Sequence, residues 1–224
     1  MVGLSAVILD LDGLMIDTER VARQAWKQAA SDFGHTISEA LFSEMTGRRR
    51  EDVRTVVMEA FGDEFPYAEV RQRRDDYFRE AIEHKEVEPK PGLFHLLRII
   101  EELGLELGIA TSGHREVTYL KLSAIGLSDR FETVVCGDDI EHGKPAPDIF
   151  LEAARRLDVL PSHCIVLEDS DVGARAADAA GMRVIVVPSL EKPADDVMTL
   201  AWRVLPSLHA AARQLEEEAV SRSG

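Results

Sequence analysis

The stretch Val7-Ile8-Leu9-Asp10-Leu11-Asp12-Gly13 decides how this chain folds and where its chemistry lies. Its apolar first half predicts a buried β-strand. Because residues i and i+2 of an extended chain point to the same side, Asp10 and Asp12 leave the carboxyl end of this strand in one direction. Open α/β sheets bind ligands at that end of their strands. Gly13 then allows a sharp turn away from the sheet.

Two carboxylates held side by side repel each other unless a cation or a shared proton relieves them. Asp10 and Asp12 therefore point to a metal site, to acid–base chemistry, or to both. A plain strand-to-turn exit is the alternative, because Asp and Gly are ordinary turn residues. The rest of the chain favours the functional interpretation.

Composition narrows the class of protein. The chain has 224 residues, of which 45% are hydrophobic, and a formal charge of −15. This charge argues against a nucleic-acid partner, which normally needs a basic surface. No apolar run approaches the roughly 20 residues that cross a bilayer, and the first residues lack a signal-peptide pattern. Cys136 and Cys164 lie in apolar runs and predict buried thiols in a reducing compartment. We expect a cytoplasmic monomer or weak homodimer that does not bind membranes.

Residues 17–88 carry helical periodicity and almost no strand signal. Helices are expected at 19–33, from Ser38 as a possible N-cap, at 51–61 and at 67–84. Pro89 and Pro91-Gly92 then mark the return of the chain. This segment predicts a small helical bundle inserted just after the first strand.

From Pro91 onward the sequence alternates between helix and strand. Strands are expected at 105–110, 133–136, 164–167 and 183–187, and helices at 93–103, 116–125, 148–157, 172–180 and 207–218. Such alternation predicts an α/β fold with a parallel sheet covered by helices. We therefore expect one domain formed by 1–16 and 89–224 and a second formed by 17–88.

Three further polar groups follow the expected strands. Thr111-Ser112-Gly113 offers a hydroxyl and free backbone N–H groups that suit a phosphate, although an ordinary helix cap is the simpler interpretation. Lys144, between Gly143 and Pro145, stands at a rigid point where it can neutralise a phosphate and hold a carboxylate. Taken alone, it fits a generic turn equally well.

Glu168-Asp169-Ser170 ends another apolar strand in adjacent acids. Mg²⁺ prefers a few carboxylates and keeps several waters, so Asp10 and Asp169 would supply two ligands from neighbouring strand ends. A helix cap is again the alternative for Asp169 or Ser170. Jointly, the four signals place acids, a hydroxyl and a lysine at one edge of one sheet, which chance does not readily produce.

The order of these residues resembles the four motifs of the haloacid dehalogenase superfamily, over about residues 5–190. Gly143-Lys144-Pro145-Ala146-Pro147-Asp148 and the stretch from Glu168 to Gly181 resemble the β-phosphoglucomutase and phosphoglycolate phosphatase subgroup. Residues 16–20 and Gly137-Asp138-Asp139 are similar to sugar-phosphate and pseudouridine-monophosphate phosphatases. The resemblance implies a Rossmann-like, three-layer α/β/α core with a helical cap, and a small phosphorylated metabolite as substrate.

The resemblance also implies a mechanism. Asp10 would attack phosphorus to form an aspartyl-phosphate, and Asp12 would act as general acid and then general base. Mg²⁺ would be held by Asp10, the Asp12 backbone carbonyl and Asp169, with Glu168 in support. Lys144 would hold Asp10 and the transferring group. Thr111 and the Ser112 amide would bind phosphoryl oxygens, as the residue order of the family implies.

Three positively charged or titratable residues are candidates for substrate specificity. Arg50 lies where mutases of the subgroup place a cap arginine, and His114 and Arg115 follow the phosphate loop. A plain surface role remains open for both arginines.

The sequence bears on three other functions. A dehalogenase of this superfamily needs neither metal nor a second acid, so Asp12 and Glu168-Asp169 argue against it. A phosphosugar mutase is the closer alternative, but Ala22 stands where mutases carry a histidine. A non-catalytic binding module is disfavoured because every motif residue is present.

Overall fold

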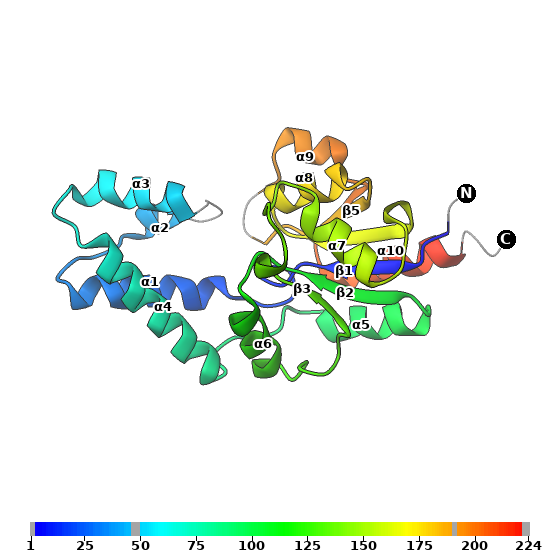
Figure 1. Cartoon of the computed structure of the whole chain (residues 1–224), viewed down its shortest axis with the longest axis horizontal. Helices are drawn as coiled ribbons and strands as arrows, with labels where there is room; N and C mark the ends of the chain where they lie inside the picture. The colour runs from blue at the N-terminus through cyan, green and yellow to red at the C-terminus, as the bar shows by residue number, and fades with distance from the viewer. Residues whose placement is uncertain (1–2, 46–49, 190–191, 221–224) are drawn as a thin grey trace. The chain divides into compact units, whose positions relative to one another are not determined.

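The chain forms two compact units. The computed structural model describes residues 3–45, 50–189 and 192–220. Met1–Asp17 and Glu88–Gly224 make up the first unit, which we call the α/β unit, and Thr18–Val87 make up the second, the helical unit. The helical unit is thus inserted into the α/β unit shortly after its first strand (Figure 1).

The α/β unit is built on a six-stranded sheet in the order β3-β2-β1-β4-β5-β6. Every neighbouring pair is parallel, which confirms the predicted fold class. The strands are β1 (Ala6–Leu9), β2 (Glu106–Ala110), β3 (Thr133–Val135), β4 (Cys164–Glu168), β5 (Arg183–Val186) and β6 (Arg203–Val204). β1 lies in the middle of the sheet because β2 and β4 pair with it on either side.

Strand register sets the geometry of the candidate site. Leu9 pairs with Ile109 on one side and with Leu167 on the other. The residues that follow these three, namely Asp10, Ala110 and Glu168, therefore form one row across the carboxyl end of the sheet. The Asp10 amide extends the ladder by donating to the Leu167 carbonyl over 3.0 Å.

Helices cover both faces of the sheet, which gives the expected three layers (Figure 1). They are α5 (Leu93–Glu102), α6 (Arg115–Ala124), α7 (Asp148–Arg156), α8 (Asp171–Ala179), α9 (Asp195–Leu200) and α10 (Leu208–Val220), with 3₁₀ turns at Gly137–Asp139 and Pro161–His163. Ile8 and Val166 pack in one core with Phe150 of α7 and Ala177 of α8. Helices α5 and α10 pack together on the other face.

One α-helix and one strand of the α/β unit were not predicted. Helix α9 and strand β6 are six and two residues long. Such short segments contain too little of the 3.6-residue or two-residue period for the sequence to reveal them. Strand β6 nevertheless extends the sheet by pairing with β5.

Over its described residues, 18–45 and 50–87, the helical unit holds four helices around its own core. They are α1 (Glu19–Asp32), α2 (Glu39–Met45), α3 (Arg50–Phe61) and α4 (Tyr67–Glu83). Trp26, Phe42, Val57 and Val70 are buried in this core. The Ser38 hydroxyl accepts a hydrogen bond from the Leu41 amide at 3.1 Å, which confirms Ser38 as the cap of α2.

Cys136 and Cys164 are buried free thiols, as predicted. Burial raises the pKa of Cys164 to about 11, so this thiol stays protonated and unreactive near neutral pH. Within the described ranges, no helix is both long and apolar enough to cross a membrane.

Phe150 offers a direct test of the core beneath the site. It is fully buried, and its ring centre lies 4.9 Å from the Lys144 ammonium. We expect Phe150→Ala to lower the free energy of unfolding by about 3–5 kcal/mol, measured by urea denaturation. Phe94→Ala is the control, because Phe94 is 53% exposed, and its effect should stay within about 0.5 kcal/mol. Equal losses in the two variants would contradict this packing.

Candidate functional site at the carboxyl edge of the sheet

The Lys144 ammonium contacts one residue at the carboxyl end of each of three neighbouring strands. It donates to Asp10 Oδ1 at 2.5 Å, to Glu168 Oε1 at 2.6 Å and to the Ala110 carbonyl at 3.2 Å. Burial alone would lower the pKa of Lys144, but the adjacent Asp10 and Glu168 carboxylates outweigh burial and raise it. Lys144 is therefore a fixed positive charge at the end of β1, β2 and β4.

Glu168 is fully engaged by protein donors. Its Oε2 accepts hydrogen bonds from the Asp169 amide, the Ser170 amide and the Ser170 hydroxyl, all at 2.8–2.9 Å. A methyl group at Gly173 would lie 1.7 Å from Glu168 Oε1, so the absence of a side chain there makes room for the carboxylate. This environment fits Glu168 as a support that orients other groups.

Ser170 rather than Asp169 caps helix α8. The Ser170 hydroxyl accepts from the Gly173 amide at 3.1 Å. The Asp169 carboxylate instead lies against the turn after β1, where a methyl group at Gly13 would fall 1.9 Å from Asp169 Oδ2. Gly13 also has a φ of +87°, a conformation that L side chains rarely adopt.

Asp10 and Asp169 are acids whose ionised forms are disfavoured by their surroundings. Burial, followed for Asp169 by the repulsion of Glu168 and Asp10, raises the pKa of Asp169 well above its ordinary value. Burial also raises the pKa of Asp10, and Lys144 offsets only part of the effect. If all of these acids were ionised, the buried oxygens would carry more negative charge than Lys144 compensates.

These oxygens suit a hard divalent cation. Magnesium is usually bound through one or two carboxylates, with waters and substrate phosphate completing its shell. Asp10 and Asp169 match that donor set. Among the described residues, no three His, Cys, Asp or Glu side chains converge into a ready-made metal cage, and Glu168 is already saturated by protein donors. The arrangement therefore fits an ion that shares its shell with substrate and water.

The sequence did not reveal the partner of Asp12. The ammonium of Lys121, a buried residue of helix α6, contacts Asp12 Oδ1 at 2.6 Å and Oδ2 at 2.7 Å. Thr118 and Leu122 are buried on the same helix. The sequence holds only one spacing signal for this contact: Lys121 follows Thr118 by three residues, which places the two side chains on one face of the helix.

The loop after β2 presents the predicted phosphate-binding residues. Thr111 is buried, and its hydroxyl accepts a hydrogen bond from the Gly113 amide at 3.2 Å, whereas Ser112 is exposed. Thr111 does not cap α6, whose cap residue is His114. A methyl group at Gly137 would lie 2.6 Å from the Ser112 carbonyl, so the next loop packs tightly against this one.

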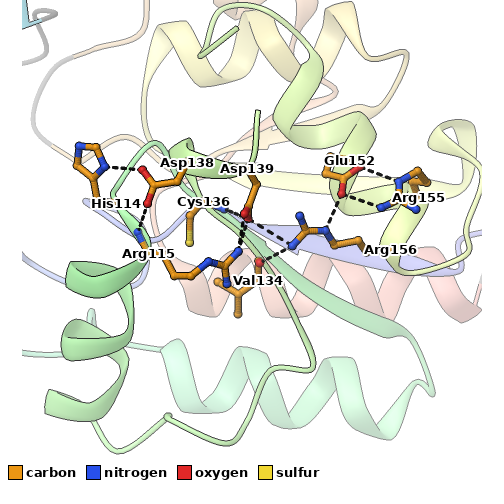
Figure 2. Close-up of polar contacts among 9 residues, drawn as sticks. All are labelled: His114, Arg115, Val134, Cys136, Asp138, Asp139, Glu152, Arg155 and Arg156. Atoms are coloured by element: carbon orange, nitrogen blue, oxygen red, sulfur yellow. Dashed lines mark hydrogen bonds and ion pairs between the residues drawn. The ribbon is translucent and has the colours of Figure 1, made fainter. Parts of the chain in front are cut away.

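Asp138 and Asp139 anchor the start of α6 (Figure 2). Asp138 Oδ2 accepts from the Arg115 amide at 2.8 Å, and Oδ1 lies 2.5 Å from His114 Nδ1. Asp139 contacts the Arg115 guanidinium at 2.5 and 2.6 Å and accepts from the Cys136 amide at 2.9 Å. These contacts fix the loop that carries Thr111 and Ser112 with respect to β3.

Arg156 of α7 joins the same network. Its guanidinium donates to the Val134 carbonyl at 3.0 Å and lies 3.3 Å from Asp139 Oδ2, while Glu152 accepts from its Nε at 2.7 Å (Figure 2). The network therefore connects β3, α6 and α7.

The three candidate specificity residues differ in the contacts that the structure describes for them. Arg115 and His114 pair with Asp139 and Asp138, and for Arg115 this favours a structural role. Arg50 begins α3, and its side chain lies outside the described residues. The specificity role of each remains a prediction.

Asp139 gives this network a pH-dependent signature. Burial disfavours its charged form, but the Cys136 amide and the Arg115 guanidinium outweigh burial and hold the pKa of Asp139 below its ordinary value. The stabilisation that ionised Asp139 gives to the folded protein is therefore present above that ordinary pKa. It disappears as the pH falls through the lower pKa of Asp139 in the folded state.

We expect Asp139→Asn to lower the free energy of unfolding at pH 7 by about 1–3 kcal/mol, because charged hydrogen bonds are lost. In urea titrations, the difference in the free energy of unfolding between Asp139→Asn and wild type should narrow as the pH falls below about 4. Glu101→Gln, which breaks an exposed pair with Arg130, should cost less than about 1 kcal/mol at any pH. A gap that stays constant with pH would refute the charge assignment.

Comparison with known proteins agrees with this geometry. The family described as haloacid dehalogenase-like hydrolase matches residues 7–187. Protein CbbY of Rhodobacter capsulatus is 31% identical over 94% of this chain and 96% of its own length. A phosphorylated carbohydrates phosphatase of Thermotoga maritima is 30% identical over 84% of this chain and 87% of its own.

A solved structure supports the same relationship. A HAD family hydrolase from Deinococcus radiodurans, crystallised with phosphate and sodium, superposes with a TM-score of 0.78 at 28% identity. The match covers 98% of each chain. The family match spans far more than half of the sequence, and the sheet order and strand-end residues accord with it. The chain belongs to the haloacid dehalogenase-like hydrolase family.

Proposed function

We propose that this protein is a Mg²⁺-dependent phosphatase that hydrolyses small phosphate monoesters, sugar phosphates or similar, through an aspartyl-phosphate on Asp10. The observation that carries the proposal is the placement of Asp10 at the end of the central strand, with Lys144 bonded to one carboxylate oxygen. A relative named as a phosphatase of phosphorylated carbohydrates supports the substrate class.

In the first half of the reaction, an Asp10 oxygen attacks phosphorus. A P–O bond forms to Asp10, the P–O bond to the leaving group breaks, and its electron pair goes to the leaving oxygen. Asp12, in its protonated form, donates a proton to that oxygen. Asp10 is activated as a nucleophile by position and by the neighbouring positive charge of Lys144.

In the second half, Asp12 acts as a base. Its carboxylate takes a proton from a water molecule as the water oxygen attacks phosphorus. The P–O bond to Asp10 breaks, which returns the Asp10 carboxylate and releases inorganic phosphate. Asp12 is protonated again and ready for the next substrate.

The remaining residues position the phosphoryl group. Thr111 and the Ser112 amide would bind its oxygens, and Lys144 would neutralise charge on it, because phosphoryl transfer depends mainly on positioning and electrostatics. Asp10, Asp169 and the Asp12 backbone carbonyl would hold Mg²⁺, with Glu168 as support. When bound, the ion supplies positive charge to the phosphoryl oxygens. We assign the selection of the leaving group to the helical unit.

A phosphosugar mutase is the competing function within the family. Such an enzyme returns the phosphoryl group to a sugar instead of to water. The mutases of the resembled subgroup carry a histidine where this chain has Ala22, and this difference favours the phosphatase.

Product analysis separates these functions. We expect wild-type protein to release inorganic phosphate from sugar phosphates, nucleoside monophosphates or phosphoglycolate with Mg²⁺, and none with a chelator. Asp10→Asn should lower turnover by at least about 10³-fold, because the nucleophile is lost. Its thermal unfolding should remain cooperative. Isomerised sugar phosphate without released phosphate would establish the mutase, and near-normal turnover of Asp10→Asn would exclude Asp10 as the nucleophile.

Gly13 tests the proposed ion site. Gly13→Ala places a methyl group 1.9 Å from Asp169 Oδ2, so the carboxylate must move. We expect Mg²⁺ affinity, measured by calorimetry, to fall by about tenfold or more, a loss in the range for displaced ligand geometry. Gly104→Ala is the matched control, because Gly104 also has a positive φ (+62°) but no atom within 4 Å of the added methyl group. If both variants bind Mg²⁺ equally well, Asp169 is not a ligand.

A further inference from the structure

Lys121 is a buried residue whose ammonium contacts the Asp12 carboxylate of the site. Its side chain is 5% exposed, whereas that of Asp12 is 35% exposed. Burying a lysine side chain costs free energy unless the charge is paired. The two contacts of 2.6 and 2.7 Å to both Asp12 oxygens supply that pairing.

The contact fixes the orientation of Asp12. A carboxylate held through both oxygens by one ammonium cannot rotate without breaking at least one hydrogen bond. A methyl group at Gly113 would lie 3.4 Å from Thr111 Oγ1 and 3.8 Å from Asp12 Oδ2. Asp12 and Thr111 therefore flank the same glycine, and Lys121 holds Asp12 beside the loop that would bind the phosphoryl group.

We propose that Lys121 is a positioning residue that directs Asp12 toward the water that hydrolyses the phosphorylated Asp10. The proposal rests on the phosphatase function inferred above. The role differs from that of Lys144, which contacts Asp10 and Glu168 instead. Lys144 serves the nucleophile, and Lys121 serves the acid–base residue.

An aryl ester isolates the step that Lys121 should affect. Nitrophenolate is a stable leaving group, so p-nitrophenyl phosphate can phosphorylate Asp10 without a proton from Asp12. Water is a poor nucleophile and still needs Asp12 as its base. Misplacing Asp12 should therefore slow the second half of the reaction and leave the first half largely intact.

The test is Lys121→Met, which replaces the ammonium by an apolar chain of similar length. In stopped-flow measurements with p-nitrophenyl phosphate and Mg²⁺, we expect kcat to fall by about tenfold or more. A burst of nitrophenolate approaching one equivalent per enzyme should precede the slow phase, because the phosphorylated enzyme accumulates. Lys121→Gln keeps one N–H donor and should give an intermediate kcat and a smaller burst. It also provides the readout if Lys121→Met does not fold.

Leu122→Ala controls for damage to the helix, since Leu122 is buried on the same helix. A merely structural role for Lys121 would slow both halves together, so the variants would show reduced kcat without a larger burst. That result, or an unchanged kcat, would overturn the proposal.

Wild-type protein and Asp10→Asn separate the two levels of inference. If wild type releases phosphate and Asp10→Asn does not, the phosphatase stands, and the Lys121 variants alone decide the positioning role. If wild type releases none from any ester, the proposed function fails and the role of Lys121 falls with it.

Discussion

The candidate site depends on the buried ammonium of Lys144, held between Asp10 and Glu168. Removing one partner of a buried ion pair typically costs about 3–5 kcal/mol, because the remaining charge is left uncompensated. Lys144 also bonds to the Ala110 carbonyl, so one side chain joins the ends of β1, β2 and β4. The strand register brings these three groups into one row, and the lysine supplies the charge that allows two acids to be buried there.

The site holds more acidic groups than Lys144 can neutralise. Burial raises the pKa of Asp10 and of Asp169, so both acids resist ionisation within the protein alone. A fold selected only for stability has no reason to keep such groups, and their presence is typical of a functional site. Gly13 and Gly173 reinforce this view, because any side chain at either position would collide with a carboxylate of the site. The charge and the close packing together explain why a divalent cation and a phosphoryl group suit this edge of the sheet.

Much of this arrangement is local in sequence and could be predicted. An apolar run ending in polar residues identified β1, β2 and β4, and parallel topology then required their ends to meet. Lys121 could not be identified in this way, because a lysine in a helix normally faces solvent, and only the packing of α6 turns it inward. The pairing of Arg115 with Asp139 spans 24 residues of chain, so the sequence offered no sign that this candidate specificity residue is held by the α/β unit.

In the proposed mechanism, Asp10 carries the phosphoryl group during turnover. The most direct measurement is acid quenching of the enzyme during turnover of p-nitrophenyl phosphate with Mg²⁺, followed by mass spectrometry of the proteolysed chain. We expect a base-labile phosphoryl adduct on the peptide that contains Asp10, and no adduct in Asp10→Asn. A phosphoryl group on another residue, or phosphate release with no adduct under conditions where its hydrolysis is rate-limiting, would contradict it.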